Sequence, residues 1–243
     1  MLTLVLSALL ACAPQSEVEA LNKKVADLEA KVATMEKSGG AKAGAAAPAG
    51  DPVKEEAATK LLTEAQEARK NGDFATAKTK LAELSANFAD TRPGKAAGRI
   101  AAEVNIVGET AKPIETEKWF TKKTAKFEDD KTTVLVFWEV WCPHCKREVP
   151  KLPEMASKWK SKGVQVVALT KITKSATEES VLEFIKEHKL EGIPMGKEKD
   201  GAMSNAYAVT GIPAAAVVKD GKVVWRGHPA QLTDDVLGKL AEG

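Results

Sequence analysis

The sequence predicts an α/β protein in which an α/β sandwich forms the C-terminal half and helices form the N-terminal half. Residues 134–138 are continuously apolar, as in a strand buried on both faces of a sheet, and helically spaced apolar residues follow up to position 159. Residues 18–35 carry an apolar seam with coiled-coil spacing, and two amphipathic stretches lie between residues 61 and 88. We therefore expect a leader at 1–11, an anchor and coiled coil at 12–37, a flexible linker at 38–52, a helical module at 53–105 and the α/β domain at 106–243.

The leader is apolar but far shorter than the roughly 20 residues of a transmembrane helix, and its small residues are typical of a secretion signal. The stretch Leu9-Leu10-Ala11-Cys12 resembles a bacterial lipobox. That resemblance implies cleavage before Cys12 and lipidation of its thiol, which would attach the protein to a membrane. The alternative is an ordinary secretion signal with a bystander thiol. Either interpretation predicts an oxidising compartment.

The seam after the leader alternates spacings of three and four, which predicts coiled-coil heptads with lysines at g facing glutamates at e of a parallel partner. The seam residues are Val18, Leu21, Val25, Leu28, Val32 and Met35. We expect a homo-oligomer: Val at a with Leu at d favours a dimer, whereas resemblance to the stalk of small murein-type lipoproteins implies a trimer. The alternative is a lone or intramolecularly packed amphipathic helix.

The Gly- and Ala-rich segment at 38–52 predicts a flexible linker, and the module after it predicts two antiparallel helices separated by a break at residues 71–73. Ile100 and Val104 indicate a third helix, and we expect Arg92-Pro93 to end the second. The turn Gly72-Asp73-Phe74 resembles that of a tetratricopeptide repeat (TPR). Because only one such unit is visible, a packing spacer or dimerisation element is favoured over a peptide-binding site.

In the α/β domain, the segment Trp141-Cys142-Pro143-His144-Cys145 lies where the buried strand gives way to a helix. Unpaired backbone N–H groups at a helix N-terminus stabilise a thiolate, and His144 adds charge or a hydrogen bond. Cys142 is therefore the candidate nucleophile, and Cys145, one turn further on, the resolving thiol. Pro143 suits the first helical turn, where its missing N–H needs no partner.

The composition of the chain limits the chemistry that Cys142 and Cys145 can carry out. A disulfide that spans two residues restricts the unfolded chain little, so a structural staple is disfavoured and redox or metal chemistry is left. A zinc site needs four ligands, or three and a water, and beyond the pair the chain offers only three histidines with no second spaced pair, which disfavours zinc. A net charge of +2 gives no field that would gather nucleic acid. We expect no cofactor, no metal and no nucleic-acid partner.

The region from about residue 107 to the end resembles the thioredoxin superfamily, in particular the periplasmic TlpA and ResA group. The resemblance rests on Phe137-Trp138, the Cys-x-x-Cys segment after Trp141, Glu148 with Pro150, and Gly211-Ile212-Pro213. It implies a thioredoxin-like sandwich with a cis peptide bond before Pro213, which faces the cysteines, and substrate pairing with the Ile212 backbone. Thioredoxin's buried acid aligns with Val136, so Glu148 is the nearest substitute as proton acceptor, with Glu139 ranked below it.

These observations predict a thiol–disulfide oxidoreductase that is lipid-anchored at the periplasmic face of a bacterial envelope. It would exchange disulfides with protein thiols through Cys142 and Cys145, in the reductive direction, with Trp141, Pro143 and His144 tuning the site and an envelope protein as redox partner. One alternative is an oligomeric isomerase or oxidase, since Pro143-His144 resembles the dipeptide of strongly oxidising DsbA-type proteins. A second alternative, of another class, is an envelope scaffold that acts through its helical segments.

Overall fold

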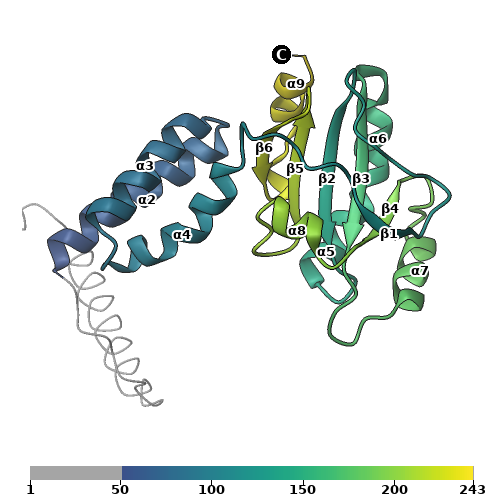
Figure 1. The fold of residues 1–243 in the computed structure, drawn as a ribbon, viewed down its shortest axis with the longest axis horizontal. Helices are drawn as coiled ribbons and strands as arrows, with labels where there is room; N and C mark the ends of the chain where they lie inside the picture. Colours follow the sequence, from purple (N-terminus) through teal and green to yellow (C-terminus); the bar gives the residue numbers. More distant parts are fainter. Residues whose placement is uncertain (1–50, 243) are drawn as a thin grey trace, which may run out of the picture. The chain divides into compact units, whose positions relative to one another are not determined.

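The computed structural model describes residues 51–242, which belong to one compact unit (Figure 1). The predicted leader, the lipidation site at Cys12, the coiled coil and nearly all of the linker lie outside the described residues. Within residues 51–242, no helix has the length and hydropathy needed to cross a bilayer.

Three helices open the described region: α2 (Pro52–Lys70), α3 (Phe74–Asn87) and α4 (Arg92–Asn105). Their shared core is made of the residues that the helical periodicity indicated, including Ala65, Leu81 and Val104, all at most 1% exposed. The expected break at 71–73 is confirmed, and the Asp73 side chain caps α3 by accepting from the Thr76 N–H. The likeness to a TPR unit stays a resemblance.

The expectation for Arg92-Pro93 was wrong in one respect. The second helix has already ended at Asn87, and Pro93 lies in the first turn of α4, where Thr91 is the N-cap. A proline fits there because the first N–H groups of a helix have no intrahelical partner. The proline therefore begins the third helix and does not end the second.

The rest of the unit is built on one mixed sheet in the order β1-β4-β3-β2-β5-β6. Strands β2, β3 and β4 are parallel to one another, and β1, β5 and β6 run antiparallel to their neighbours. The strands are β1 (Thr116–Trp119), β2 (Thr132–Trp138), β3 (Val164–Thr170), β4 (Met195–Glu198), β5 (Ala214–Lys219) and β6 (Lys222–Gly227). The sequence predicts the four long strands from apolar runs at 134–138, 164–169, 214–218 and 223–225, whereas it did not predict β1 or β4.

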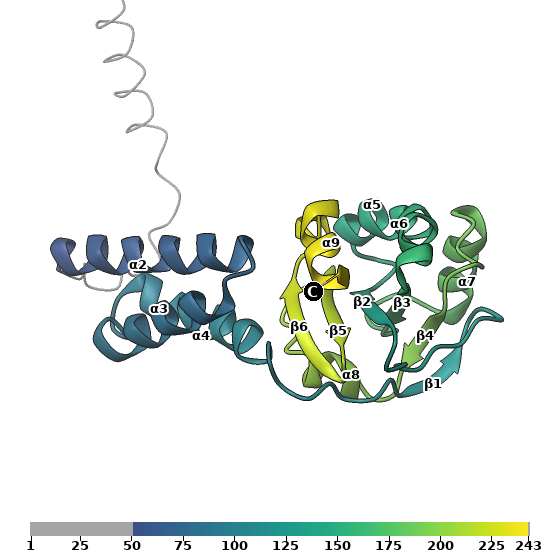
Figure 2. The same cartoon turned by 90° about the horizontal axis from the view of Figure 1, so that it is seen from above.

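Helices cover both faces of this sheet, as Figure 2 shows. On one face lie α5 (Pro143–Glu148), α6 (Leu152–Trp159), α7 (Glu178–Glu187) and α9 (Asp234–Glu242), and on the other lies the unexpected α8 (Ala202–Ala206). Alternate residues of β2 serve the two cores: Val134, Val136 and Trp138 pack on the first face, and Leu135 and Phe137 on the second. Packing on both faces fixes the end of β2, and therefore the segment that follows it.

The helical module is joined to the sheet by backbone hydrogen bonds. After α4, the chain runs along the outer edge of β6, where Gly108 N–H donates to the Val223 carbonyl at 2.7 Å and Ala111 N–H to the Gly221 carbonyl at 2.8 Å. Lys78 of α3 donates to the Val107 carbonyl at 2.7 Å. The apolar cores of the helices and of the first sheet face form one buried cluster.

Candidate active site

Cys142 and Cys145 lie where the chain passes from the end of β2 into the first turn of α5, as the sequence predicted. Cys142 is the N-cap of α5, Pro143 is in its first turn, and the Cys145 N–H donates to Cys142 Sγ at 3.4 Å. Both cysteines are free thiols, with Cys142 4% exposed and Cys145 fully buried. When a bond to the Cys142 sulfur breaks, negative charge develops on that sulfur. The Cys145 N–H is already in place to donate a hydrogen bond to it.

Burial separates the chemistry of the two thiols. Burial raises the pKa of Cys145 most, followed by its hydrogen bond with Cys142. A hydrogen bond with the Glu139 backbone lowers this pKa, and the negative charges of Cys142 and Glu139 raise it by less. A low-dielectric site disfavours the charged form of an acid, so Cys145 resists ionisation. Cys142 is therefore the candidate nucleophile, and Cys145 is the candidate resolving thiol.

The loop before β5 faces the outer thiol. The Ile212–Pro213 peptide bond is cis, as the resemblance implied, and the Cys142 thiol donates to the Ile212 carbonyl at a sulfur–oxygen distance of 3.6 Å. A cavity of about 430 Å³ opens here, lined on one side by Trp141, Cys142, Pro143 and His144 and on the other by residues 209–212. An extended peptide laid on this loop would meet Cys142 and not Cys145.

Glu139 is the carboxylate that the structure couples most closely to the thiols. It is 5% exposed, and its Oε2 accepts from Trp141 Nε1 at 2.7 Å and from the Thr173 hydroxyl. Trp141 is held from its other side by Lys174, whose Nζ lies 3.1 Å from the ring centroid. Glu139 thus orients the indole that walls the cavity, and its charge opposes ionisation of Cys145. The sequence offered Glu139 as a candidate but ranked it below Glu148.

Glu148 lies elsewhere, at the C-terminal end of α5. Its side chain is 14% exposed and pairs with Lys151 at 2.9 Å. Burial lowers the pKa of His228, and the charge of Glu148 acts on that imidazole in the opposite direction. Among the described residues, Glu148 makes no hydrogen bond to either cysteine. Its role as a proton acceptor stays a prediction.

The His144 side chain is exposed to solvent. Its Nδ1 lies 2.5 Å from an Nη of Arg147. Because a guanidinium only donates, Nδ1 accepts and the ring proton is on Nε2. This ring is accessible to a substrate in the cavity, of which His144 forms part of the lining. No group of three or more potential metal ligands occurs within residues 51–242.

A mixed sheet, a Cys-x-x-Cys pair at the start of a helix and a cis-proline loop opposite it together define a thioredoxin-like domain. Residues 107–226 match the AhpC/TSA family, so this part of the chain is similar to that family.

Relatives of known name match the same region. The chain is 36% identical over 111 residues to the thiol-disulfide oxidoreductase ResA of Bacillus cereus strain ZK, which covers 45% of this chain and 62% of ResA. It is 28% identical over 129 residues to the sporulation thiol-disulfide oxidoreductase A of Bacillus subtilis, covering 51% and 78%. The chain spans about half of the length, 53%, of the ResA of Bacillus thuringiensis. A solved putative thiol:disulfide interchange protein DsbE from Chlorobium tepidum shares 22% identity and a TM-score of 0.46, covering 56% of this chain and 98% of its own.

Proposed function

We propose that this protein is a thiol–disulfide oxidoreductase that exchanges disulfides with protein substrates through Cys142 and Cys145. The observation that carries the proposal is the asymmetry of the pair. One thiol opens onto a cavity beside a cis-proline loop, and the other is buried and held protonated one turn behind it. The names of the relatives agree with this chemistry.

The reaction transfers two electrons in two exchanges. The Cys142 thiolate attacks one sulfur of a substrate disulfide, which forms a mixed disulfide and releases the other substrate sulfur as a thiolate that takes up a proton. Cys145 then loses its proton and attacks Cys142 Sγ, so that the mixed disulfide breaks and the second substrate thiol leaves. The substrate gains two protons and two electrons, and the Cys142–Cys145 disulfide is left.

The substrate would bind as an extended segment on the loop at 210–212. Ile212 presents its carbonyl next to the reacting sulfur, so a substrate backbone that pairs with this loop has its cysteine over Cys142. Trp141, fixed by Glu139 and Lys174, forms the opposite wall. Binding through backbone pairing depends little on the side chains of the substrate, which suits an enzyme with several protein substrates.

We assign the reductive direction to the exchange. Glu148 and Ile212 resemble the corresponding residues of the reducing relatives, and this resemblance supports the assignment. Pro143-His144 and the predicted heptads favour the second candidate, an oligomeric isomerase whose several sites would share one space.

Equilibration of the full chain with glutathione buffers of defined ratio tests both the chemistry and the direction. We expect a reversible Cys142–Cys145 disulfide with a potential near about −270 mV, whereas about −120 mV would identify an oxidant or isomerase. If no reversible disulfide forms, the proposed function fails and the alternative of an envelope scaffold gains support.

The cellular setting follows from the leader. We place the protein in a bacterial envelope, anchored by lipid on Cys12 and associated through residues 18–35, with an envelope protein as its redox partner. Mass spectrometry of the mature N-terminus checks the anchor: we expect acylated Cys12 as the first residue, and Cys12→Ser should release the protein from membranes. An unmodified Cys12 would contradict the anchor but not the exchange chemistry.

A further inference from the structure

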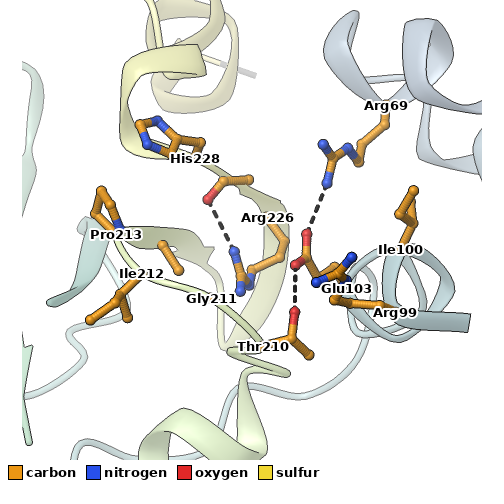
Figure 3. A pocket seen from close by; sticks show the side chains of 12 residues that line it. Arg69, Arg99, Ile100, Glu103, Thr210, Gly211, Ile212, Pro213, Arg226 and His228 are labelled. Atoms are coloured by element: carbon orange, nitrogen blue, oxygen red, sulfur yellow. Dashed lines mark hydrogen bonds and ion pairs between the residues drawn. The ribbon is translucent and has the colours of Figure 1, made fainter. Parts of the chain in front are cut away.

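A second cavity, of about 340 Å³, lies between the helical module and the cis-proline loop (Figure 3). Its walls are α2 and α4 on one side, and the loop at 210–214 with the end of β6 on the other. Thr210, Gly211 and Ile212 line this cavity and the active-site cavity alike. A substrate segment on this loop is therefore in reach of both.

The lining of this cavity is strongly basic. Arg69 and Arg99 reach in from the helices and Arg226 from β6, against the single carboxylate of Glu103, which leaves two net positive charges. His228 is also in the lining. Such an excess around a concave, partly buried space attracts an anion.

The carboxylate of Glu103 already accepts a hydrogen bond through each of its two oxygens. Glu103 accepts from Arg69 at 2.8 Å through one oxygen and from the Thr210 hydroxyl at 3.1 Å through the other. This chain of contacts ties α2 and α4 to the cis-proline loop. Only one of the three arginines is thereby paired with a carboxylate.

The other donors lack an anionic partner among the described residues. Arg226 is 2% exposed and donates to backbone carbonyls, those of Tyr207 at 2.9 Å and Gly227 at 3.0 Å among them. Arg99 is exposed and makes no hydrogen bond or ion pair within residues 51–242, and the buried Nε of Arg69 has no partner there. A second carboxylate in the cavity would meet Arg99 and the Nε of Arg69, and charge-assisted hydrogen bonds of this kind are the strong ones.

We propose that this cavity is a specificity subsite that receives an acidic side chain of the protein substrate, from the segment that lies on the cis-proline loop. This proposal rests on the proposed function, and it names the preferred substrates as proteins with an acidic residue near the reacting cysteine. A strand paired with the loop advances about 3.3 Å per residue, so a side chain only a few positions from the substrate cysteine lies over the cavity. Ile100 and Pro213 offer apolar contact to the methylenes of an Asp or Glu side chain.

The test compares two disulfide-linked peptides that differ only in Glu or Gln at one position near the cysteine, scanned over the neighbouring positions. The reduced full chain is mixed with each peptide, and the second-order rate constants are measured. At the best position we expect the Glu peptide to react about fivefold faster, a factor that corresponds to about 1 kcal/mol. The ratio should fall towards one in Arg99→Gln, a change that the exposure of Arg99 makes safe for folding.

Two matched variants control for net charge. Arg92→Gln removes one positive charge from the same helix outside the cavity, and should keep the ratio of the unaltered protein. Lys171→Gln removes one from the lining of the active-site cavity. A ratio lost in Lys171→Gln but kept in Arg99→Gln would overturn the subsite, because the preference would then arise beside Cys142.

The remaining outcomes separate the two proposals. If both peptides are reduced at equal rates at every position, the subsite is wrong while the exchange function stands. If neither peptide is reduced, the proposed function fails and the subsite fails with it.

Discussion

The two segments on either side of the Cys-x-x-Cys motif each carry a glutamate, and their surroundings differ. The turn that precedes Cys142 buries Glu139 in contact with Trp141 and Thr173, whereas the largely buried Glu148 at the end of α5 is paired with the exposed Lys151. Coulomb interactions strengthen as the local dielectric falls, so the buried carboxylate acts on Cys145 and the paired one is screened. Each glutamate lies three residues from a cysteine of the motif, and the ion pair with Lys151 is what distinguishes Glu148 from Glu139.

Substitution of either cysteine should have the largest effect of all the changes considered. Cys142→Ser should lower the rate of disulfide exchange by at least about 1,000-fold, because no nucleophile then meets the substrate. Cys145→Ser should instead form the mixed disulfide and stop there, since nothing resolves it. Trapped complexes on non-reducing gels distinguish the two variants. Accumulation of mixed disulfide in Cys142→Ser and not in Cys145→Ser would reverse the assignment of roles.

Glu139→Gln tests the comparison directly, with Glu148→Gln as its matched control. Removal of the buried charge lowers the pKa of Cys145, so more thiolate is present at neutral pH. Because the gain in thiolate exceeds the loss in nucleophilicity, we expect the mixed disulfide to be resolved faster, by about twofold. Stopped-flow release of the second product measures this step. The Glu148 variant should stay within about 1.5-fold.

The opposite result would reassign the two glutamates. Slower resolution in Glu139→Gln would make Glu139 the acceptor of the Cys145 proton and not only an electrostatic neighbour. Slower resolution confined to Glu148→Gln would instead support the role that the family resemblance gives to Glu148, reached through movement or water.

The buried thiol also makes stability depend on pH. Because burial raises the pKa of Cys145 above the 9.0 of a free thiol, the unfolded chain loses this proton first as pH rises. The contribution is complete below about pH 9 and declines above it by about 1.4 kcal/mol per pH unit. Urea unfolding of the reduced protein at about pH 8 and about pH 10 measures the loss.

Cys145→Ser is the control for this loss. Burial raises the pKa of Tyr207 too, so some decline in strongly alkaline solution is shared by both proteins. The difference between them isolates the thiol. Equal pH dependence in the two proteins would contradict the buried, protonated state of Cys145.

The last expected effect concerns Trp141, which forms one wall of the active-site cavity. Trp141→Phe keeps an aromatic ring but removes the N–H that donates to Glu139. Because Thr173 still donates to the same oxygen, we expect a loss of about 1 kcal/mol in the free energy of unfolding. Thr173→Val should have a similar effect. No change in either variant would mean that water replaces these donors.

The parts of the fold that the sequence predicted are those with strong local patterns. The wholly buried β2 and the helical faces of α6 and α7 have the apolar periods expected of them. Strands β1 and β4 have four residues each and include lysine and glutamate, and α8 has five residues, so none of them carries a full period. These elements form because the edge of the sheet and its second face offer a place to pack.

The residues of the candidate site likewise fall into two groups: those that a local pattern predicts, and those that only the folded chain brings together. The roles of Cys142, Cys145 and Pro143 follow from their place at a helix start, which is a local feature. The closeness of Glu139 to Thr173 depends on a contact across 34 residues, and that of Cys142 to Ile212 on one across 70. The basic cavity draws on α2, α4, the cis-proline loop and β6, and no motif in the sequence marks it.

The central claim is that electrons pass from this dithiol to a protein disulfide, and stoichiometric transfer tests it most directly. The reduced full chain is mixed with a model protein disulfide, quenched with acid, alkylated and weighed by mass spectrometry. We expect each lost substrate disulfide to be matched by one Cys142–Cys145 disulfide that resists alkylation. A substrate that stays oxidised while Cys142 and Cys145 remain open to alkylation would contradict the account.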